Sequence, residues 1–420
     1  MGIFQRHHAH RLRLRGAGYF HRLGPGIVTG AADDDPSGIG TYSQVGAVQG
    51  NQLLWSAPTL FPLAAAVQES CARLGLVTGS GLAAIIRERL PRPILFLAVA
   101  AVSIANSFNI AADLASMSAA LELIVPVPHL IGLLGFVATI TLAEVLIPYH
   151  RYARVLRWLC LSLLAYVGVL AVAHVDWADV IHATFLPAMN FEKVTIAALI
   201  ALAGTTISPY LFFWQASEEV EETAGHPDLS TSHMKSMRLD VFTGMASAVI
   251  VMFAIMATAA ATLHSNGITD IQTAEDAASA LKPLAGQFAS LLFLAGIVGT
   301  GLLAVPVLAG STAYAVSETV NWPEGLEKRP SQAPAFYAVI VVSMVIALVI
   351  DFIGISPMHF LYLAAILNGL AAPLLIIIVW WLARDHELMN QWRSKKLSQS
   401  LVLLTACTMI ALPVIWLFAP

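Results

Sequence analysis

Long apolar runs alternate with short polar segments along the whole chain. Runs of about 20 apolar residues suffice to cross the hydrocarbon core of a bilayer. Such runs recur eleven times, at residues 24–50, 52–77, 93–124, 128–147, 154–173, 194–217, 239–263, 283–317, 334–352, 357–383 and 398–418. Because the connecting segments are too short for a soluble domain, the pattern predicts an all-α membrane protein with about eleven transmembrane helices. We expect a single transmembrane domain over residues 24–420, preceded by a basic tail at residues 1–23.

Composition supports this class. Hydrophobic residues make up 58% of the chain and charged residues 11%, with a mean hydropathy of +0.75, whereas about 25% of residues are charged in soluble proteins. The three cysteines are scattered and show neither a disulfide framework nor a metal-ligand spacing. We therefore expect the lipid bilayer as the environment, with no nucleic acid and no obligate protein partner.

The positive charges are distributed unequally between the two sets of loops. With eleven spans, 20 of the 22 lysines and arginines fall on one side, and Lys193 and Lys282 on the other. Positive residues are retained on the cytoplasmic side of a membrane. The sequence thus predicts a multi-pass protein of the cytoplasmic (inner) membrane, with a cytoplasmic amino terminus and an extracytoplasmic carboxyl terminus.

Two of the apolar runs are interrupted in the middle by proline and polar residues. The interruptions are Gly30-Ala-Ala-Asp-Asp-Asp-Pro-Ser-Gly38 in the first run and Gly204-Thr-Thr-Ile-Ser-Pro-Tyr210 in the sixth. Unpaired backbone groups are costly in lipid, but they are tolerated where they line a watery cavity. Paired broken helices of this kind are typical of the central site of a transporter built from inverted repeats. We expect helices 1–5 and 6–10 to form two such repeats, with helix 11 outside them.

The first interruption carries the leading candidate for cation binding, Asp35. A carboxylate inside a span is usually paired or bound to a cation. Pro36 removes a backbone donor and displaces the helix, while Ser37 and Gly38 allow the chain to turn and are candidate metal-site residues with Asp35. Carboxylate and free carbonyls together form an oxygen cage for a metal ion. The alternative is that an aspartate here caps the second half-helix, and Asp34 is a candidate for the ion pathway.

The second interruption offers hydroxyl groups. Thr205 and Ser208 are three residues apart and share a helix face, so both are candidate metal ligands opposite Asp35. The alternative is that each hydroxyl bonds back to its own helix.

Other polar residues lie within or beside the apolar runs. Asp113 shares one face of the third span with Asn106, Asn109 and Met117, which should face the bundle interior. Gln215 follows the second interruption by about two turns, and Asn368 lies in the tenth span. Glu218 belongs to the acidic stretch 218–222 at the predicted cytoplasmic end of the sixth span, which either attracts cations or is a solvated helix end. We include Asp113, Gln215, Glu218 and Asn368 as candidate pathway residues.

Taken together, these motifs resemble the Nramp family of divalent-metal transporters. The first helix of that family resembles two segments of this chain, Gly24-Pro-Gly-Ile27 and Asp35-Pro-Ser-Gly38, which are followed by Trp55. Gly204 to Tyr210 resemble its sixth helix, and Ala112-Asp-Leu-Ala115 resemble its third. The resemblance implies alternating-access uptake of a divalent metal ion as substrate, with no enzymatic activity.

The departures from the family pattern bear on the choice of ion. The family has an asparagine where this chain has Gly38, a methionine at Ser208 and a histidine at Tyr210, and an acid at Ser116. Replacing a thioether by a hydroxyl makes the site all-oxygen, and losing the asparagine is expected to enlarge it. Mg²⁺ keeps several waters and takes few carboxylates. The substitutions therefore resemble the Nramp-related magnesium branch, so hydrated Mg²⁺ carried without proton coupling is the expected substrate.

Three other functions remain open from the sequence. The first is proton-coupled import of Mn²⁺ or another transition metal. The second is a cation-coupled carrier of an organic solute with the same fold, which an aspartate at the break and the lack of basic residues at span centres disfavour. The third is an intramembrane enzyme, against which stands the absence of an HExxH motif or a Ser–His arrangement.

Overall fold

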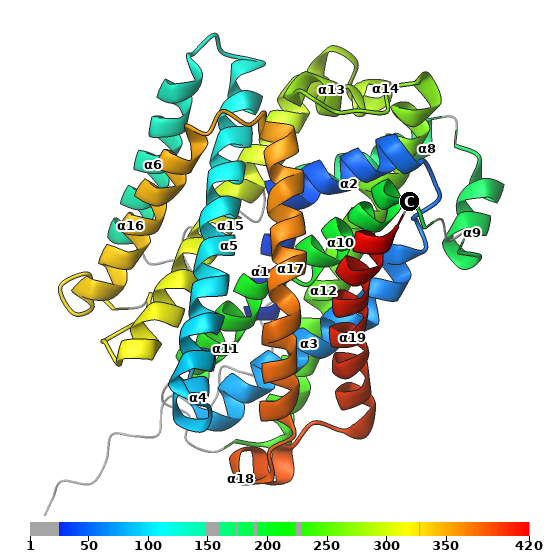
Figure 1. Ribbon diagram of the computed structural model, residues 1–420. Coiled ribbons are helices and arrows are strands. Elements are labelled where there is room, and N and C mark those ends of the chain that lie inside the picture. The colour runs from blue at the N-terminus through cyan, green and yellow to red at the C-terminus, as the bar shows by residue number, and fades with distance from the viewer. Residues whose placement is uncertain are drawn as a thin grey trace, which may run out of the picture.

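Helices account for all the regular structure in the described part of the chain (Figure 1). The computed structural model describes residues 25–147, 160–173, 175–187, 191–223, 229–326 and 328–419. The basic tail expected at residues 1–23 lies outside these ranges. The all-α prediction is confirmed.

Eight long helices form most of the bundle: α3 (Ser56–Thr78), α5 (Arg92–Glu122), α6 (His129–Leu146), α12 (Thr231–Thr262), α15 (Ala289–Val320), α16 (Pro334–Asp351), α17 (Pro357–Ala383) and α19 (Lys396–Phe418). Two further pairs are the broken helices: α1 (Pro25–Asp33) with α2 (Pro36–Gln49), and α10 (Lys193–Thr206) with α11 (Pro209–Thr223). Short elements connect them: α4 (Leu82–Arg89), η2 (Cys160–Leu163), α8 (Leu164–Val172), α9 (Trp177–Phe185), η3 (His264–Asn266), α13 (Ala274–Ser279), α14 (Lys282–Ala285), η4 (Gly286–Phe288), α18 (His386–Met389) and η5 (Asn390–Trp392).

Nine segments of the described chain are long and apolar enough to cross a membrane. They match nine of the eleven predicted runs. The first run is divided into α1 and α2, each too short to span alone, and residues 154–159 of the fifth run lie outside the described ranges. The total of eleven spans therefore stays a prediction.

The sixth run is the most deeply buried of these segments. Within Lys193–Glu222, which contains α10 and α11, 94% of the apolar window is buried inside the protein, compared with 22% for both α6 and α19. Figure 1 shows α6 and α16 together at one side of the bundle, with the broken helices inside it. The two interruptions are thus shielded from lipid, as unpaired backbone groups require.

Glycines at both interruptions allow close contact with neighbouring helices. A Cβ atom on Gly30 would collide with the backbone of Gly244 in α12, and one on Gly204 would collide with the backbone of Ala365 and Gly369 in α17. Small residues at such contacts let membrane helices approach closely. Each broken helix is therefore held against an unbroken one at the point where its own hydrogen bonding stops.

Candidate cation site between two helix breaks

Asp35 lies at the first break and caps the second half-helix. Its Oδ1 accepts hydrogen bonds from the Ser37 hydroxyl at 2.8 Å and from the Gly38 backbone N–H at 2.7 Å. The capping role that the sequence left open as an alternative is therefore real. It engages Oδ1, whereas Oδ2 accepts one longer bond, 3.4 Å, from the hydroxyl of Tyr210. Capping and ion binding are compatible, because they use different oxygens.

The second break separates Thr206 from Pro209. The Ser208 hydroxyl donates to the carbonyls of Gly204, at 3.0 Å, and Thr205, at 2.7 Å. In this arrangement Ser208 bonds back to its own helix, which is the alternative that the sequence also allowed. Its hydroxyl oxygen keeps lone pairs that can still accept or coordinate. Thr205 is buried beside it, with 1% of its surface exposed.

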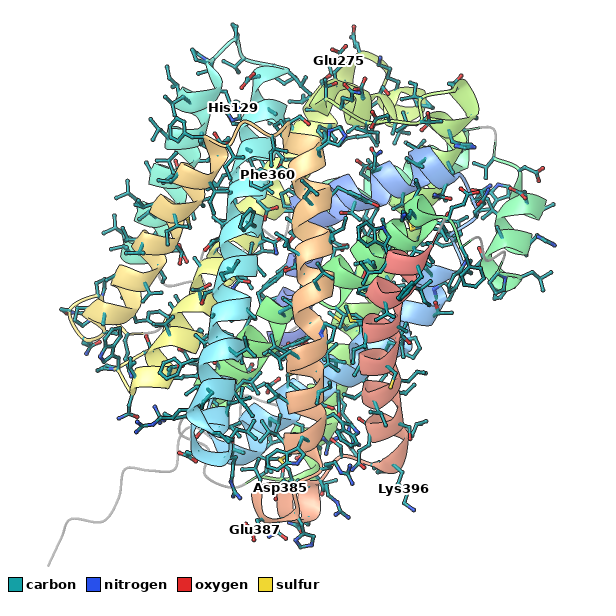
Figure 2. The ribbon with its side chains drawn as sticks, viewed as in Figure 1. His129, Glu275, Phe360, Asp385, Glu387 and Lys396 are labelled. Carbon is teal, nitrogen blue, oxygen red and sulfur yellow. The ribbon has the colours of Figure 1, made fainter. Side chains whose placement is uncertain are left out.

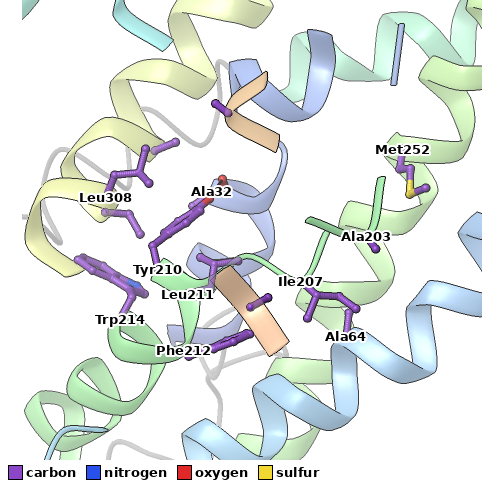
Figure 3. Packing of buried hydrophobic residues seen from close by; sticks show 14 of the residues in the cluster. Ala32, Ala64, Ala203, Ile207, Tyr210, Leu211, Phe212, Trp214, Met252 and Leu308 are labelled. Atoms are coloured by element: carbon purple, nitrogen blue, oxygen red, sulfur yellow. Dashed lines mark hydrogen bonds between the residues drawn. The ribbon is translucent and has the colours of Figure 1, made fainter. Parts of the chain in front are cut away.

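Tyr210 connects the two breaks. Its hydroxyl donates to the carbonyl of Ala32 at 2.8 Å, and it also approaches Oδ2 of Asp35. Figure 3 shows the ring of Tyr210 directed from the start of α11 toward Ala32 in α1. Asp35, the Ala32 carbonyl and the second break therefore meet at one point in the interior.

The space beside Gly38 corrects one expectation. We expected the loss of an asparagine side chain at this position to enlarge the site. A Cβ on Gly38 would instead lie 3.1 Å from the carbonyl oxygen of Asp33 and 3.3 Å from the ring of Tyr42. The ring and the backbone fill the space, so the glycine leaves no additional room at this point for a hydrated ion.

Several buried carboxylate oxygens near the first break lack hydrogen-bond partners among the described residues. They are both Oδ atoms of Asp33, Oδ1 of Asp34 and both Oδ atoms of Asp113. Asp113, on α5, interacts electrostatically with Asp35 and approaches the backbone amide of Ser37. Clustered buried carboxyl groups without partners are stabilised by a proton or a cation. Asp34 lies in the first break and Asp113 interacts with Asp35 beside it, and their role in an ion pathway stays a prediction.

Within the described ranges, no three His, Cys, Asp or Glu side chains converge as a metal centre. A cation at Asp35 would therefore be held by at most two such side chains, together with carbonyls, hydroxyls and water. Such oxygen sets suit hard ions.

Gln215 joins the two broken helices on the next turns of α11. Its Oε1 accepts from the Thr29 hydroxyl at 2.6 Å, and its Nε2 donates to Oε1 of Glu219 at 3.0 Å. The structure thus gives Gln215 a bridging position between α1 and α11. Glu218, at the end of the same helix, accepts a bond of 3.4 Å from the hydroxyl of Tyr314.

The polar face predicted on the third span is confirmed as an interior face. Asn106, Asn109, Asp113 and Met117 are all fully buried. Asn106 donates to Thr312 at 2.9 Å, which is an interhelical hydrogen bond. Both polar atoms of Asn109 and of Asn368, in α17, are buried without partners in the described part of the chain. Unsatisfied buried amides of this kind are available to an ion or to water.

Sequence reasoning did not include Tyr42, Thr206 and Met252 in the candidate set. The hydroxyls of Tyr42 and Thr206 lie 3.5 Å apart, and that of Thr206 lies 3.6 Å from the sulfur of Met252. Tyr42 is one turn beyond Gly38 on the same helix face, a spacing that could have indicated it. Met252 is far away in sequence, and nothing in the chain's pattern marks it.

The fold and the two breaks define the class: a multi-pass membrane transporter with interrupted helices at a central site. A family model described as "Natural resistance-associated macrophage protein-like" (Nramp) matches residues 26–419. The chain therefore belongs to the Nramp family, and the resemblance inferred from its motifs is confirmed.

Curated relatives agree over nearly the full length. The chain is 27% identical over 400 residues to the divalent metal cation transporter MntH of Aeromonas hydrophila, covering 93% of each chain. It is 28% identical over 401 residues to the protein of the same name from Erwinia tasmaniensis, covering 94% of this chain and 93% of the other.

Solved structures show the same fold. The manganese transporter of Eremococcus coleocola matches with a TM-score of 0.78 at 16% identity, covering 95% of this chain and 87% of the other. Mhp1, a nucleobase-cation-symport-1 family transporter in a closed conformation, matches with a TM-score of 0.60 at 14% identity, covering 95% and 93%. Because the fold is shared by carriers with different substrates, the site has to decide the substrate.

Proposed function

We propose that this chain carries a divalent metal cation across the membrane by alternating access, with the ion held between the two helix breaks. One observation supports this most strongly: Asp35 is buried in the interior with its Oδ2 directed toward Tyr210 of the second break, while Oδ1 is used by the helix cap. A buried carboxylate at meeting half-helices is suited to a cation and disfavours an anionic solute. The names of the MntH relatives support the same class of substrate.

For the identity of the ion, we favour Mn²⁺. The relatives include a manganese transporter, and the packing around Gly38 offers no extra room for an ion that keeps its water shell. Carboxylate, carbonyl and hydroxyl oxygens suit Mn²⁺ as well as Mg²⁺ and disfavour soft ions such as Cd²⁺, because the thioether at position 208 is replaced by serine.

Uncoupled import of Mg²⁺ is the second candidate. It is favoured by Tyr210 and Ser116, which stand where the family resemblance implies a histidine and an acid. The Ser116 hydroxyl donates to the carbonyl of Asp113 at 2.8 Å, and neither side chain titrates near neutral pH. The membrane potential alone supplies about 4.6 kcal/mol per 100 mV for a divalent ion, twice ~2.3 for a unit charge. Import without protons is therefore energetically sufficient.

Uptake into sealed proteoliposomes separates these candidates. Mn²⁺, Mg²⁺ and Cd²⁺ are offered in turn under an inside-negative potential while a trapped dye reports internal pH. Mn²⁺ entry with acidification supports a proton-coupled manganese importer, and Mg²⁺ entry without acidification supports the second candidate. No uptake of any divalent ion would refute both.

A pair of variants at one position tests the hard-ligand argument. Ser208→Met restores a thioether and should raise Cd²⁺ uptake relative to Mn²⁺ uptake. Ser208→Ala removes the same hydroxyl without adding sulfur and is the matched control. An unchanged Cd²⁺ to Mn²⁺ ratio in Ser208→Met would show that position 208 does not contact the ion.

A further inference from the structure

A basic cavity lies at one end of the bundle, away from the helix breaks. It has a volume of about 540 Å³ and is formed where α17 ends and α19 begins. Figure 2 shows Lys396 at the same end as Asp385, opposite His129 and Glu275. By the distribution of lysine and arginine, this end is the one expected to face the cytoplasm.

Four cations line this cavity: Arg384, Arg393, Lys395 and Lys396. Among the described residues, none of the four forms an ion pair with a carboxylate. The neighbouring acids are engaged elsewhere, since Asp385 and Glu387 both pair with Arg89. The cavity therefore keeps a concentrated positive charge.

Two further features of the cavity favour an anion with oxygen acceptors. Ser394 lines it with only 4% of its surface exposed, and its hydroxyl has no hydrogen-bond partner in the described chain. Its backbone is fixed, because its N–H donates to the Ala383 carbonyl at 3.2 Å and its carbonyl accepts from Gln399 at 2.6 Å. The amino terminus of α19, a helix of 23 residues, begins at Lys396 and adds free backbone N–H groups.

The surroundings of the cavity indicate a lipid more than a soluble anion. Arg384 lies over the ring of Trp380, 4.4 Å from its centroid, and tryptophan is typical of the headgroup level of a membrane. Leu397, which follows Lys396 in the chain, is 73% exposed, and Trp381, three residues before Arg384, is 42% exposed. An apolar surface adjoining a basic cavity matches a molecule with an anionic head and acyl chains.

We propose that this cavity binds the phosphate headgroup of an anionic phospholipid. The four cations and the Ser394 hydroxyl contact the phosphate oxygens, and the acyl chains lie along Leu397 and Trp381. Basic pockets between membrane helices on the cytoplasmic side recognise such headgroups. A lipid bound in this cavity contacts the start of the last helix, α19, and anchors it to the surrounding membrane.

Native mass spectrometry of the purified, delipidated full chain tests this. Phosphatidylglycerol and phosphatidylcholine are titrated separately. Phosphatidylglycerol should bind at least tenfold more tightly. The Lys395→Gln/Lys396→Gln variant should lose about 25-fold in affinity, a factor of about five for each charge. Lys235→Gln/Arg329→Gln, which removes two exposed charges elsewhere, is the matched control and should bind as the parent does.

Three results would overturn the proposal. They are equal affinity for the two lipids, an equal loss in the control variant, and displacement of the lipid by millimolar inorganic phosphate, which would identify a soluble-phosphate site. A second variant, Ser394→Val, leaves all charges in place and should weaken phosphatidylglycerol binding alone. Thermal unfolding of each variant establishes that it is folded, and the lipid readout does not depend on which ion is transported.

Discussion

Asp35→Asn is the most informative perturbation, because it removes a charge while retaining the helix cap. Asparagine caps helices about as well as aspartate, whereas alanine costs about 1 kcal/mol. The bonds from Ser37 and the Gly38 amide to the side-chain oxygen, at 2.8 and 2.7 Å, can therefore persist. A loss of transport in Asp35→Asn then reports on charge, and any additional loss of stability in Asp35→Ala reports on capping.

The size of the effect follows from electrostatics. A divalent ion about 4 Å from the carboxylate interacts with it by about 8 kcal/mol at an effective dielectric constant near 20, twice the ~4 kcal/mol of two unit charges. Most of this is offset by removing water from the ion and the carboxylate. If a quarter remains, about 2 kcal/mol, the Kd rises about 30-fold.

The assay is the concentration dependence of Mn²⁺ uptake into proteoliposomes. Asp35→Asn should need about 30-fold more Mn²⁺ for half-maximal uptake. Glu275→Gln removes an exposed carboxylate in α13 and serves as the control. Wild-type half-saturation in Asp35→Asn would refute the reasoning, since no ion would then be bound by this carboxylate.

Three further predictions concern packing and protonation, each measured by thermal unfolding in detergent. Gly38→Asn should destabilise the protein by about 1–3 kcal/mol through overpacking against Tyr42; the same substitution should cost less in a Tyr42→Ala background, and an unchanged unfolding midpoint in Gly38→Asn would contradict the prediction. Gln215→Ala should cost about 1–3 kcal/mol because the buried Thr29 hydroxyl loses its acceptor and the hydrogen bond to Glu219 is removed, while the exposed Gln52→Ala should cost nothing. Burial, with Glu318 and Glu221 nearby, raises the pKa of Glu324 from 4.5 to about 8. The folded protein then holds a proton that the unfolded chain releases near pH 4.5, so this group lowers the free energy of unfolding as the pH rises from about 4.5 to 8. Glu324→Gln should flatten that decline, and an unchanged slope would contradict this prediction.

The sequence was sufficient to predict the architecture because membrane helices follow from local composition. The interruptions at Asp35-Pro36 and Ser208-Pro209 were visible because proline and polar residues stand out within apolar runs. The burial of Asp113 could also be predicted, because its helical spacing from Asn109 places both residues on one face of an apolar run.

The features of the site that could not be predicted from the sequence depend on contacts between segments far apart along the chain. The Tyr210 hydroxyl reaches the Ala32 carbonyl across 178 positions, and no local pattern indicates such a bond. The filled space beside Gly38 is likewise set by Tyr42 and by the Asp33 carbonyl. The expected enlargement beside Gly38 was wrong because a missing side chain leaves a cavity only where the neighbouring groups do not fill the space.

We propose above that the ion is bound between the two helix breaks at Asp35. Anomalous diffraction from crystals grown with Mn²⁺ tests it most directly. We expect one strong peak about 2.1 to 2.6 Å from Oδ2 of Asp35, beside Tyr210 and the second break. A peak at the acidic end of α11, near Glu218, with none at Asp35 would contradict it.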